Sequence, residues 1–355
     1  MLIYSIYQFV CMENKKNFID VIRMFAPGTS LRSALDDLLR ARMGALIVFK
    51  TPELDSLMEG GFGIKCKFSP QKLVELAKMD GAIVLSEDGK KILYANVMLH
   101  PSLDIFSRET GTRHKSGERT AKQAKTITVT VSERKNKISI YYCDERHELE
   151  SASILLSRTS EVLQVLEKQR EIFNDLLRKF NILEVNNLVT IKDISNFLRR
   201  IEISKKVAEL IRRYLIELGK EGMIISMRLR ELVGDIPRIE DYLLEDYFGM
   251  DSKRILSMVE SLSFDSLLEQ STIYELLSEE VNDKFVSPKG IRLLSRMGLE
   301  EKSLGLLLSK FDCLKRILKA SDEELFDVFG SAEDVDYFKN SLNELKQNIL
   351  LNKDI

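Results

Sequence analysis

The chain has 355 residues, of which 44% are hydrophobic and 30% are charged, and its formal net charge is −2. This composition excludes a disordered chain or a single small core and indicates two or three folded domains. A net charge near zero argues against a protein that coats nucleic acid but leaves room for a local basic site. The four cysteines are widely spaced and form no CxxC pair, which argues against a disulfide framework or zinc site and fits a reducing, cytoplasmic compartment.

The first twelve residues, Met1–Met12, are apolar and aromatic, but they lack a basic start and a small-residue cleavage site. They are also too short to span a bilayer, so we expect neither a signal peptide nor a membrane anchor. Charged sequence typical of a helix begins at Glu13. We therefore hypothesise that translation starts at Met12, and an intact mass that includes Met1 would contradict this.

From the N-terminus to about residue 147, helical patterns alternate with short apolar runs. The pattern predicts one helix over 31–40 and a second that begins at Ser69-Pro70, with Ser69 as its N-cap. Asp88-Gly89 indicates a hairpin between two of the predicted strands. The predicted strands cover 44–49, 82–85, 92–95, 127–131 and 138–142. Strands mixed with helices predict an α/β domain with a mixed sheet and helical cover.

From about residue 148 the sequence becomes almost continuously helical. One apolar stripe at helical spacing predicts a long helix whose buried face serves packing rather than ligand binding. The stripe consists of Leu155, Val162, Leu166, Phe173, Leu177 and Phe180. Further helices are predicted over 204–218 and 223–232, and Pro288 with Gly290 marks a last boundary. We therefore expect three domains: 1–147, an all-α helical spine over 148–287, and 288–355.

The segment 108–125 concentrates positive charge among glycines and small hydroxyl residues. Its basic side chains are Arg108, Arg113, Lys115, Arg119, Lys122 and Lys125, with His114 among them. Arginine forks, lysine charges and exposed backbone amides all suit phosphate oxygens, and a helix that begins here would point its N-terminus at the anion. A solvated basic face is the alternative explanation, and composition alone favours it.

Asp80-Gly81-Ala82 stands at a predicted helix-to-strand junction. A carboxylate at such a junction is suited to hold a divalent metal beside a bound triphosphate, whereas an ordinary turn is the simpler interpretation.

Taken together, these motifs resemble the DisA-type diadenylate cyclases. Asp80-Gly81-Ala82 followed by Gly111-Thr112-Arg113-His114 is similar to the paired signature of that family. The similarity extends over nearly the whole chain, although it is weakest from 237 to 285. It includes Ala26–Arg32, Met43–Val48, Lys78–Ser86, Tyr94–Val97, Glu109–His114, Thr190–Asp193, Leu215–Gly222 and Arg228–Leu232.

The resemblance implies that two cyclase domains meet face to face, each with one ATP and Mg²⁺ or Mn²⁺, and form cyclic di-AMP, a second messenger. It implies at least a dimer and suggests an octamer, with no membrane attachment. By the same resemblance, Asp80, Arg113 and His114 are the catalytic residues, and Asp80 is the metal ligand. The implied ATP-binding residues are Gly81, Ala82, Leu99, Gly111, Thr112, Arg113, His114, Lys115, Ser116 and Ser132.

Several positions depart from the family pattern. Where the family commonly has Arg-His-Arg-Thr, this chain has Arg113-His114-Lys115-Ser116, and Gly117 replaces the usual alanine. Lysine keeps the charge but loses the bidentate fork. Glu133 stands in an expected basic cluster and would repel phosphate if it pointed inward. We therefore expect cyclase activity, with a rate lowered by these changes.

The C-terminal region resembles the helix-hairpin-helix DNA-binding domain of the family. The expected glycine pair with basic residues is replaced by Gly330, Ala332 and the acidic Glu333, Asp334 and Asp336. Acidic groups beside phosphate repel it, so we expect a degenerate hairpin that is kept for packing, with binding of branched DNA reduced or lost.

Two other functions remain open at this stage. One is a catalytically weak nucleotide-binding scaffold that senses DNA or protein partners, and formation of the product would distinguish it from the enzyme. The other is an α/β domain with a helical extension and no nucleotide site, which the pairing of Asp80 with Arg113-His114-Lys115 disfavours.

Overall fold

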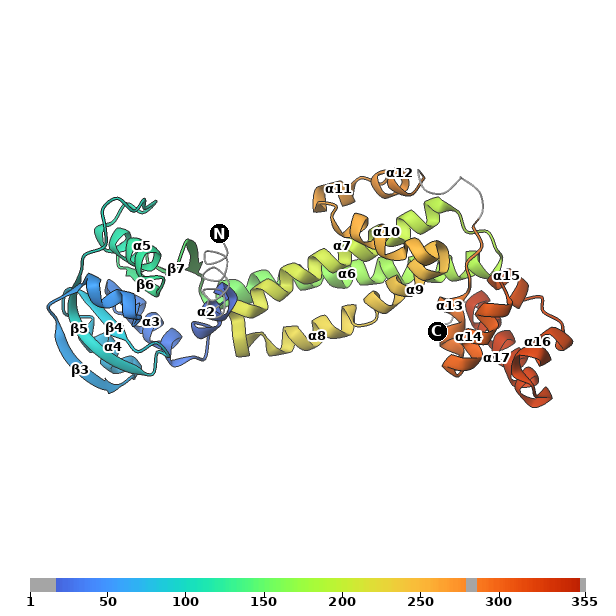
Figure 1. Cartoon of the computed structure of the whole chain (residues 1–355), viewed down its shortest axis with the longest axis horizontal. Coiled ribbons are helices and arrows are strands. Elements are labelled where there is room, and N and C mark those ends of the chain that lie inside the picture. The colour runs from blue at the N-terminus through green and yellow to red at the C-terminus, as the bar shows by residue number, and fades with distance from the viewer. Residues whose placement is uncertain (1–16, 279–285, 352–355) are drawn as a thin grey trace, which may run out of the picture. The chain divides into compact units, whose positions relative to one another are not determined.

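The computed structural model describes residues 17–278 and 286–351 (Figure 1). The hypothesis about Met1 and Met12 therefore lies outside the described residues. The chain divides into two compact units. The first comprises 1–160 with 212–226, and the second comprises 161–211 with 227–355.

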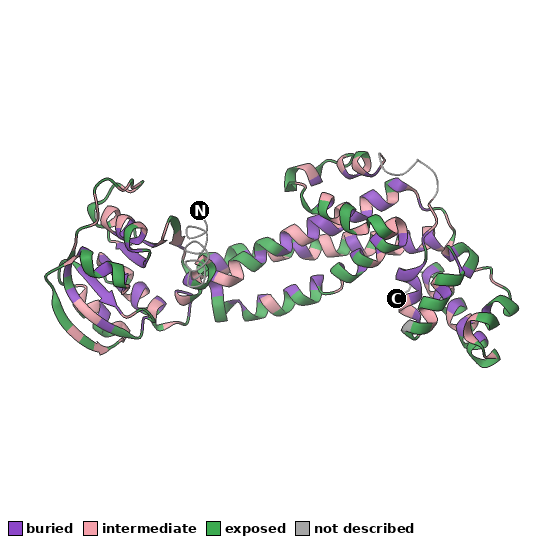
Figure 2. Ribbon diagram, viewed as in Figure 1, coloured by how far each residue is buried: buried purple, intermediate pink, exposed green. Residues whose placement is uncertain are grey.

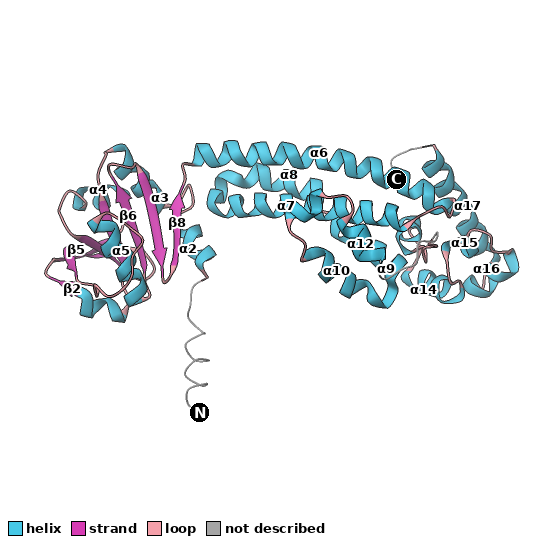
Figure 3. Cartoon of the chain, turned by 90° about the horizontal axis from the view of Figure 1, so that it is seen from above, coloured by secondary structure: helices cyan, strands magenta, loops and turns pink. Residues whose placement is uncertain are grey.

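The first unit is built on an eight-stranded mixed sheet with helices on both faces (Figures 1 and 3). The strand order is β2-β5-β4-β1-β6-β7-β8, and β3 pairs with β5. Only the β1–β4 pair is parallel among the recorded pairings. The strands are β1 (Ala45–Phe49), β2 (Met58–Glu59), β3 (Phe62–Lys67), β4 (Ala82–Leu85), β5 (Lys91–Leu99), β6 (Ile127–Ser132), β7 (Lys137–Tyr142) and β8 (Glu145–Leu149).

The two faces of this sheet are covered by different helices. The described helices that accompany the sheet are α2 (Phe18–Met24), α3 (Ser30–Arg40), the 3₁₀ helix η1 (Pro52–Leu57), α4 (Pro70–Leu76) and α5 (Thr112–Ala124). One core joins α2, α3 and α4 to the sheet, and a smaller core joins η1 and α5 to the opposite face. Buried residues accordingly follow one another along β1, β4 and β6, which Figure 2 colours as buried over most of their length.

Strand β6 shows how the sequence pattern produces these two faces. Ile127, Val129 and Val131 enter the core beneath α2–α4. Thr128 and Thr130 alternate with them and face the α5 side, where the Thr128 hydroxyl donates to the Gly117 carbonyl at 2.9 Å. The alternation of apolar and threonine side chains along β6 therefore gives the sheet an apolar face beneath α2–α4 and a polar face beneath α5.

The rest of the chain is helical, as the sequence predicted. The long helices are α6 (Ala152–Val185) and α7 (Ile191–Leu218), and they are followed by η2 (Gly219–Gly222) and α8 (Met223–Val233). Phe173 and Phe180 of the predicted stripe are buried and stack on Phe197 of α7, with ring centroids 5.3 and 5.0 Å apart. The prediction of a packing face on α6 is confirmed.

Short helices complete the second unit. They are α9 (Ile236–Phe248), η3 (Gly249–Asp251), α10 (Ser252–Glu260), α11 (Phe264–Leu268), α12 (Thr272–Ser278), α13 (Ile291–Leu294), η4 (Ser295–Met297), α14 (Glu301–Lys310), α15 (Leu314–Ile317), α16 (Asp322–Phe329) and α17 (Ala332–Leu350). The helices from α13 onward share a core of their own. Within the described residues, no helix is long and apolar enough to cross a membrane.

Candidate active site

Strand register brings the predicted site residues to one edge of the sheet. β1 and β4 run parallel with Leu46 opposite Ala82, so the start of β4 with Asp80 and the start of β1 with Gly44 lie at the same edge. β6 runs antiparallel to β1 and ends there at Ser132, and β5 ends there at Leu99. With strands roughly 4.8 Å apart, this edge spans a length comparable to that of a nucleotide.

Gly81 brings the Asp80 segment close to β5. Its φ is +87°, and a Cβ atom here would lie 2.9 Å from the carbonyl oxygen of Val97 and 2.9 Å from the carbonyl carbon of Asn96. A side chain would therefore clash with backbone, and the positive φ also favours glycine. Ala82 is buried in the small core on the α5 side, and Leu99 is partly buried against the same core.

The carboxylate of Asp80 is exposed and makes no hydrogen bond or ion pair with any residue in 17–278 or 286–351. A carboxylate without a partner on the protein is available to a ligand. Asp80 stands two residues before the start of β4.

Helix α5 begins at this edge with unpaired amides. Gly111 is its N-cap and has no side chain to cap the helix, and the first helical amide bond runs from Lys115 to the Gly111 carbonyl at 2.8 Å. The amides of Thr112, Arg113 and His114 consequently have no partner among the described residues. A helix start with three open N–H groups attracts anions through both hydrogen bonding and the helix dipole.

Arg113 reaches from α5 toward the start of β1. A Cβ atom added at Gly44 would lie 2.0 Å from one of its terminal nitrogens, so the absence of a side chain at Gly44 makes room for the guanidinium. Arg113 itself is exposed and has no hydrogen-bond partner in the described part of the chain. Its charge therefore lies unneutralised along the edge between Asp80 and Ser132.

Beside the start of α5 lies a cavity of about 280 Å³. Gly111, His114 and Ser132 line it, so the structure brings three predicted residues together. Its other lining residues were not predicted from the sequence, and they are Glu109, Thr110, Arg134, Lys135, Lys137, Ser139, Arg146 and Glu148. Four of these carry positive charge and two carry negative charge.

The remaining predicted residues lie outside the lining of this cavity. Lys115 and Ser116 are half-buried in the first turns of α5, and Thr112 is exposed at its first position. Glu133 is exposed and does not line the cavity, so the repulsion considered for an inward-pointing carboxylate does not arise there. The basic residues that line the cavity come from the turn after β6 and from β7 and β8. The alternation of polar and apolar residues along β7 and β8 could have indicated which of their side chains face this side of the sheet.

Burial lowers the pKa of His114 below its usual value of 6.5. The carboxylate of Glu109 opposes this, while the positive charges of Lys135, Arg113 and Arg146 add to it. His114 is therefore largely neutral at neutral pH, and its imidazole can donate one hydrogen bond and accept another.

Part of the basic run has a structural role instead of facing the edge. Arg119 donates to the carbonyls of Leu103 and Ile105, and Lys122 donates to the carbonyl of Phe106 and to Glu118. Both side chains thus fasten the loop 101–110 onto α5. Of the positive charges predicted to meet phosphate, Arg113 is left open beside Gly44, while the charges that line the cavity come from the turn after β6 and from β7 and β8.

Sequence comparison agrees with this geometry. The family described as "DisA bacterial checkpoint controller nucleotide-binding" matches residues 32–146, and the family described as "DisA bacterial checkpoint controller linker region" matches residues 149–285. The first match covers the sheet, Asp80 and the start of α5. The fold and site therefore define a nucleotide-binding domain of the diadenylate cyclase class.

Full-length relatives extend the match. DNA integrity scanning protein DisA of Acetivibrio thermocellus is 42% identical over 333 residues, which are 91% of this chain and 92% of the relative. The protein of the same name from Clostridioides difficile is 38% identical over 97% of this chain and all of its own length. The chain belongs to the DisA family of diadenylate cyclases.

Among solved structures, DacA from Staphylococcus aureus is 28% identical and covers 37% of this chain and 91% of its own, with a TM-score of 0.30. A score this low adds nothing to the assignment, which rests on sequence.

Proposed function

We propose that this cyclase condenses two ATP molecules into cyclic di-AMP at the edge formed by Asp80, Arg113 and the start of α5. In each of two facing copies, the 3′-oxygen of one ATP forms a bond to the α-phosphorus of the other. The bond from that phosphorus to the bridging oxygen breaks, pyrophosphate leaves, and the hydroxyl proton passes to solvent or base. Two such steps give one cyclic di-AMP and two pyrophosphates.

The observation that carries this proposal lies at one sheet edge, where a carboxylate, three backbone amides and a guanidinium occur together and none has a partner within residues 17–278 and 286–351. The amides of Thr112, Arg113 and His114 suit the α-phosphate, and the Arg113 charge suits its developing negative charge. Lys135, Lys137 and Ser132 suit the departing pyrophosphate in the cavity. Each copy binds only one of the two ATP molecules that react with each other. The rate of cyclic di-AMP formation therefore depends on how a dimer positions the two nucleotides.

The residues present fit a divalent cation that arrives with the nucleotide. Among the residues described, no three His, Cys, Asp or Glu side chains gather into a preformed metal cluster. Asp80 offers one open carboxylate, and Mg²⁺ commonly takes one or two carboxylates together with substrate phosphates and water. Bound Mg²⁺ or Mn²⁺ would neutralise phosphate charge and polarise the phosphoryl group. Asp80 would hold it near the attacking 3′-hydroxyl.

Asp80→Asn tests this assignment. We expect cyclic di-AMP formation from ATP with Mg²⁺ or Mn²⁺, measured by chromatography and mass spectrometry, to fall on the order of 100-fold, as when one charge-stabilising group is lost. Glu53→Gln removes another exposed carboxylate of the same unit and should retain parental activity. An Asp80→Asn variant as active as the parent would refute the role of Asp80, and a parent that forms no product would refute the cyclase proposal.

The oligomer is at least a dimer in this proposal, and the family resemblance suggests an octamer. Light scattering on the protein as it elutes from a sizing column measures its mass. A monomer at concentrations where product forms would contradict the face-to-face arrangement. Because ATP is the substrate, we propose that the reaction takes place in the cytoplasm.

We also propose that the C-terminal helices form a hairpin with weakened DNA binding. α16 ends at Phe329 and is capped by Gly330, whose φ is +72°, and α17 starts at Ala332. Phe329 and Phe338 hold the two helices together, with ring centroids 5.2 Å apart. Glu333 and Asp334 are exposed in the first turn of α17, where a DNA phosphate would approach. Such carboxylates disfavour binding.

Reversing these charges should strengthen DNA binding. We expect Glu333→Lys with Asp334→Lys to bind a branched DNA more tightly than the parent in a fluorescence-anisotropy titration. The salt slope should steepen by about 0.9 for each new phosphate contact. Glu344→Lys, further along the same helix and exposed, is the control and should change affinity less. Tight and salt-sensitive binding by the parent itself would contradict the proposed loss.

A further inference from the structure

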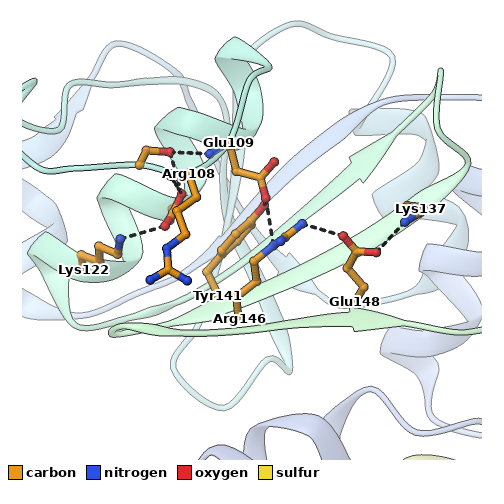
Figure 4. A network of polar contacts seen from close by, with 9 residues as sticks. Arg108, Glu109, Lys122, Lys137, Tyr141, Arg146 and Glu148 are labelled. Atoms are coloured by element: carbon orange, nitrogen blue, oxygen red, sulfur yellow. Dashed lines mark hydrogen bonds and ion pairs between the residues drawn. The ribbon is translucent and has the colours of Figure 1, made fainter.

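Glu109 is a carboxylate at the cavity that the proposed reaction does not use. It stands two residues before Gly111, the N-cap of α5, and its side chain is only 9% exposed. The Tyr141 hydroxyl donates to its Oε1 atom at 2.8 Å, and Arg146 Nε donates to the same atom at 2.9 Å (Figure 4). A carboxylate that lines a phosphate-binding cavity repels the ligand unless nearby donors offset its charge. The presence of Glu109 at this cavity, with two donors bound to it, therefore requires an explanation.

Both donors stand on adjacent, paired strands of the sheet. Tyr141 of β7 is fully buried and lies directly opposite Arg146 of β8. Arg146 also donates to Glu148 at 2.5 Å, and Glu148 accepts from Lys137 at 2.7 Å. Alternating charges thus run across β7 and β8, and Figure 4 shows that Glu109 is the point where this network leaves the sheet for the segment leading into α5.

We infer that Glu109 is a positioning residue: held by Tyr141 and Arg146, it fixes the segment 110–111 so that the open amides of α5 and His114 meet the phosphates of ATP. This inference rests on the proposed function. Helix α5 is fastened at its later turns by Glu118, Arg119 and Lys122 to the loop 101–110. The Glu109 contacts hold the other end of that loop to the sheet, at the point where the N-cap begins.

The charge of Glu109 also acts on His114. The charged groups with the largest effect on the pKa of His114 are Arg113 on α5, Lys135 in the turn after β6, Arg146 on β8 and Glu109 itself, and Arg134, Lys137 and Glu148 also line the same cavity. Arg113, Lys135 and Arg146 lower the pKa of His114, whereas Glu109 raises it. Loss of the Glu109 charge should therefore shift the titration of His114 to lower pH, whereas removal of the Tyr141 hydroxyl, which leaves that charge in place, should not.

Two variants separate the contributions of Glu109. Glu109→Gln keeps the size of the side chain but removes its charge, and Tyr141→Phe removes one donor with little change in volume. We expect each to lower kcat about tenfold with less than a twofold change in KM. Small misplacements at a reacting centre reduce the rate by factors of this size or larger. Tyr94→Phe on β5 is the matched control, because the Tyr94 hydroxyl has no hydrogen bond among the described residues, and it should retain the parental kcat.

The titration of His114 is measured by NMR of histidine labelled with ¹³C in the full chain. The chain has three histidines, so His100→Gln and His147→Gln assign the signals. We expect the midpoint of His114 to move to lower pH in Glu109→Gln and to move little in Tyr141→Phe. Unchanged kcat in both variants, or an unchanged midpoint in Glu109→Gln, would overturn the inference. The titration needs no turnover, so its result stays separate from a failure of the parent to make cyclic di-AMP.

Discussion

At the residue scale, Gly117 is the departure from the family pattern for which the structure gives a reason. It is buried on α5 against β6 and β1. A Cβ atom here would lie 2.8 Å from Thr130 Cγ2 and 3.2 Å from Leu46 Cδ1. Both distances are shorter than van der Waals contact, so the helix in this chain lies closer to its sheet than an alanine allows.

Gly117→Ala should therefore lower stability, although alanine favours a helix by about 1 kcal/mol over glycine. Overpacking typically costs about 1–3 kcal/mol, which outweighs that gain. We expect a lower melting temperature by calorimetry. Thr130→Ser removes the methyl group that clashes, so the double variant should recover part of the loss. A Gly117→Ala variant more stable than the parent would show that α5 shifts without strain.

At the scale of the element, the loop 101–110 is held onto α5 by the buried carboxylate of Glu118. It accepts from the Ser107 hydroxyl at 2.6 Å, the Arg108 amide at 3.0 Å and Lys122 at 2.7 Å. Burial by itself would raise the pKa of Glu118, but these donors outweigh burial and hold the pKa below its usual value of 4.5. The loop therefore depends on the ionised carboxylate.

The pH dependence follows from that lowered pKa. The Glu118 contribution is complete above pH 4.5, the unfolded value, and is lost as pH falls through the lower folded value. We expect Glu118→Gln to speed hydrogen exchange of the Ser107–Thr110 amides near pH 6. The difference from the parent should shrink as pH falls below 4.5 and through the lowered pKa of the folded state, where the parental carboxylate becomes protonated. Equal exchange at pH 6 would mean that Glu118 does not secure the loop.

At the scale of the whole molecule, the second unit has its own buried polar centre, remote in sequence from the cyclase residues. Arg292 is 1% exposed, pairs with Glu184 of α6 and lies 5.4 Å from the Phe180 ring centroid. Tyr247 donates to Glu184 at 2.9 Å. Asp246 accepts from three amides at 290–292, and its burial, together with the Glu184 charge, raises its pKa to about 7. These contacts join α6, α9 and α13 within one unit.

Removing one partner of a buried pair commonly costs about 3–5 kcal/mol, because the other charge is left without compensation. We expect Arg292→Met to destabilise the second unit by this amount in denaturant unfolding. Adding Glu184→Gln should restore part of the stability, since the Glu184 charge is then no longer buried without its partner. Equal stability of the single and double variants would contradict a paired role.

The same buried centre bears on the test of DNA binding. Deletion of 288–355 would remove Arg292 and expose its partners, so point variants are the better test of DNA binding.

Much of the molecule was accessible from the sequence, because local patterns decide local structure. Periodicity predicted α3, α6 and the strands at β1, β4, β6 and β7, and the Asp88-Gly89 turn predicted the hairpin between β4 and β5. The motifs around Asp80 and Arg113 indicated the family, which the relatives confirm. The roles of the individual site residues stay predictions.

What the tertiary structure decided is which of those residues meet. Parallel pairing of β1 with β4 sets Asp80 beside Gly44, and Gly44 leaves room for Arg113. The cations of the cavity come from β7, β8 and the turn after β6. Their proximity to Gly111 could not be predicted from the sequence, because these residues are far from Gly111 along the chain. The sequence by itself determined the chemistry available and the elements that carry it. Non-local contacts decided which side chains are held by other parts of the chain, as Arg119 is by the loop 101–110, and strand register brought Asp80 to the edge where its carboxylate stays open to a ligand.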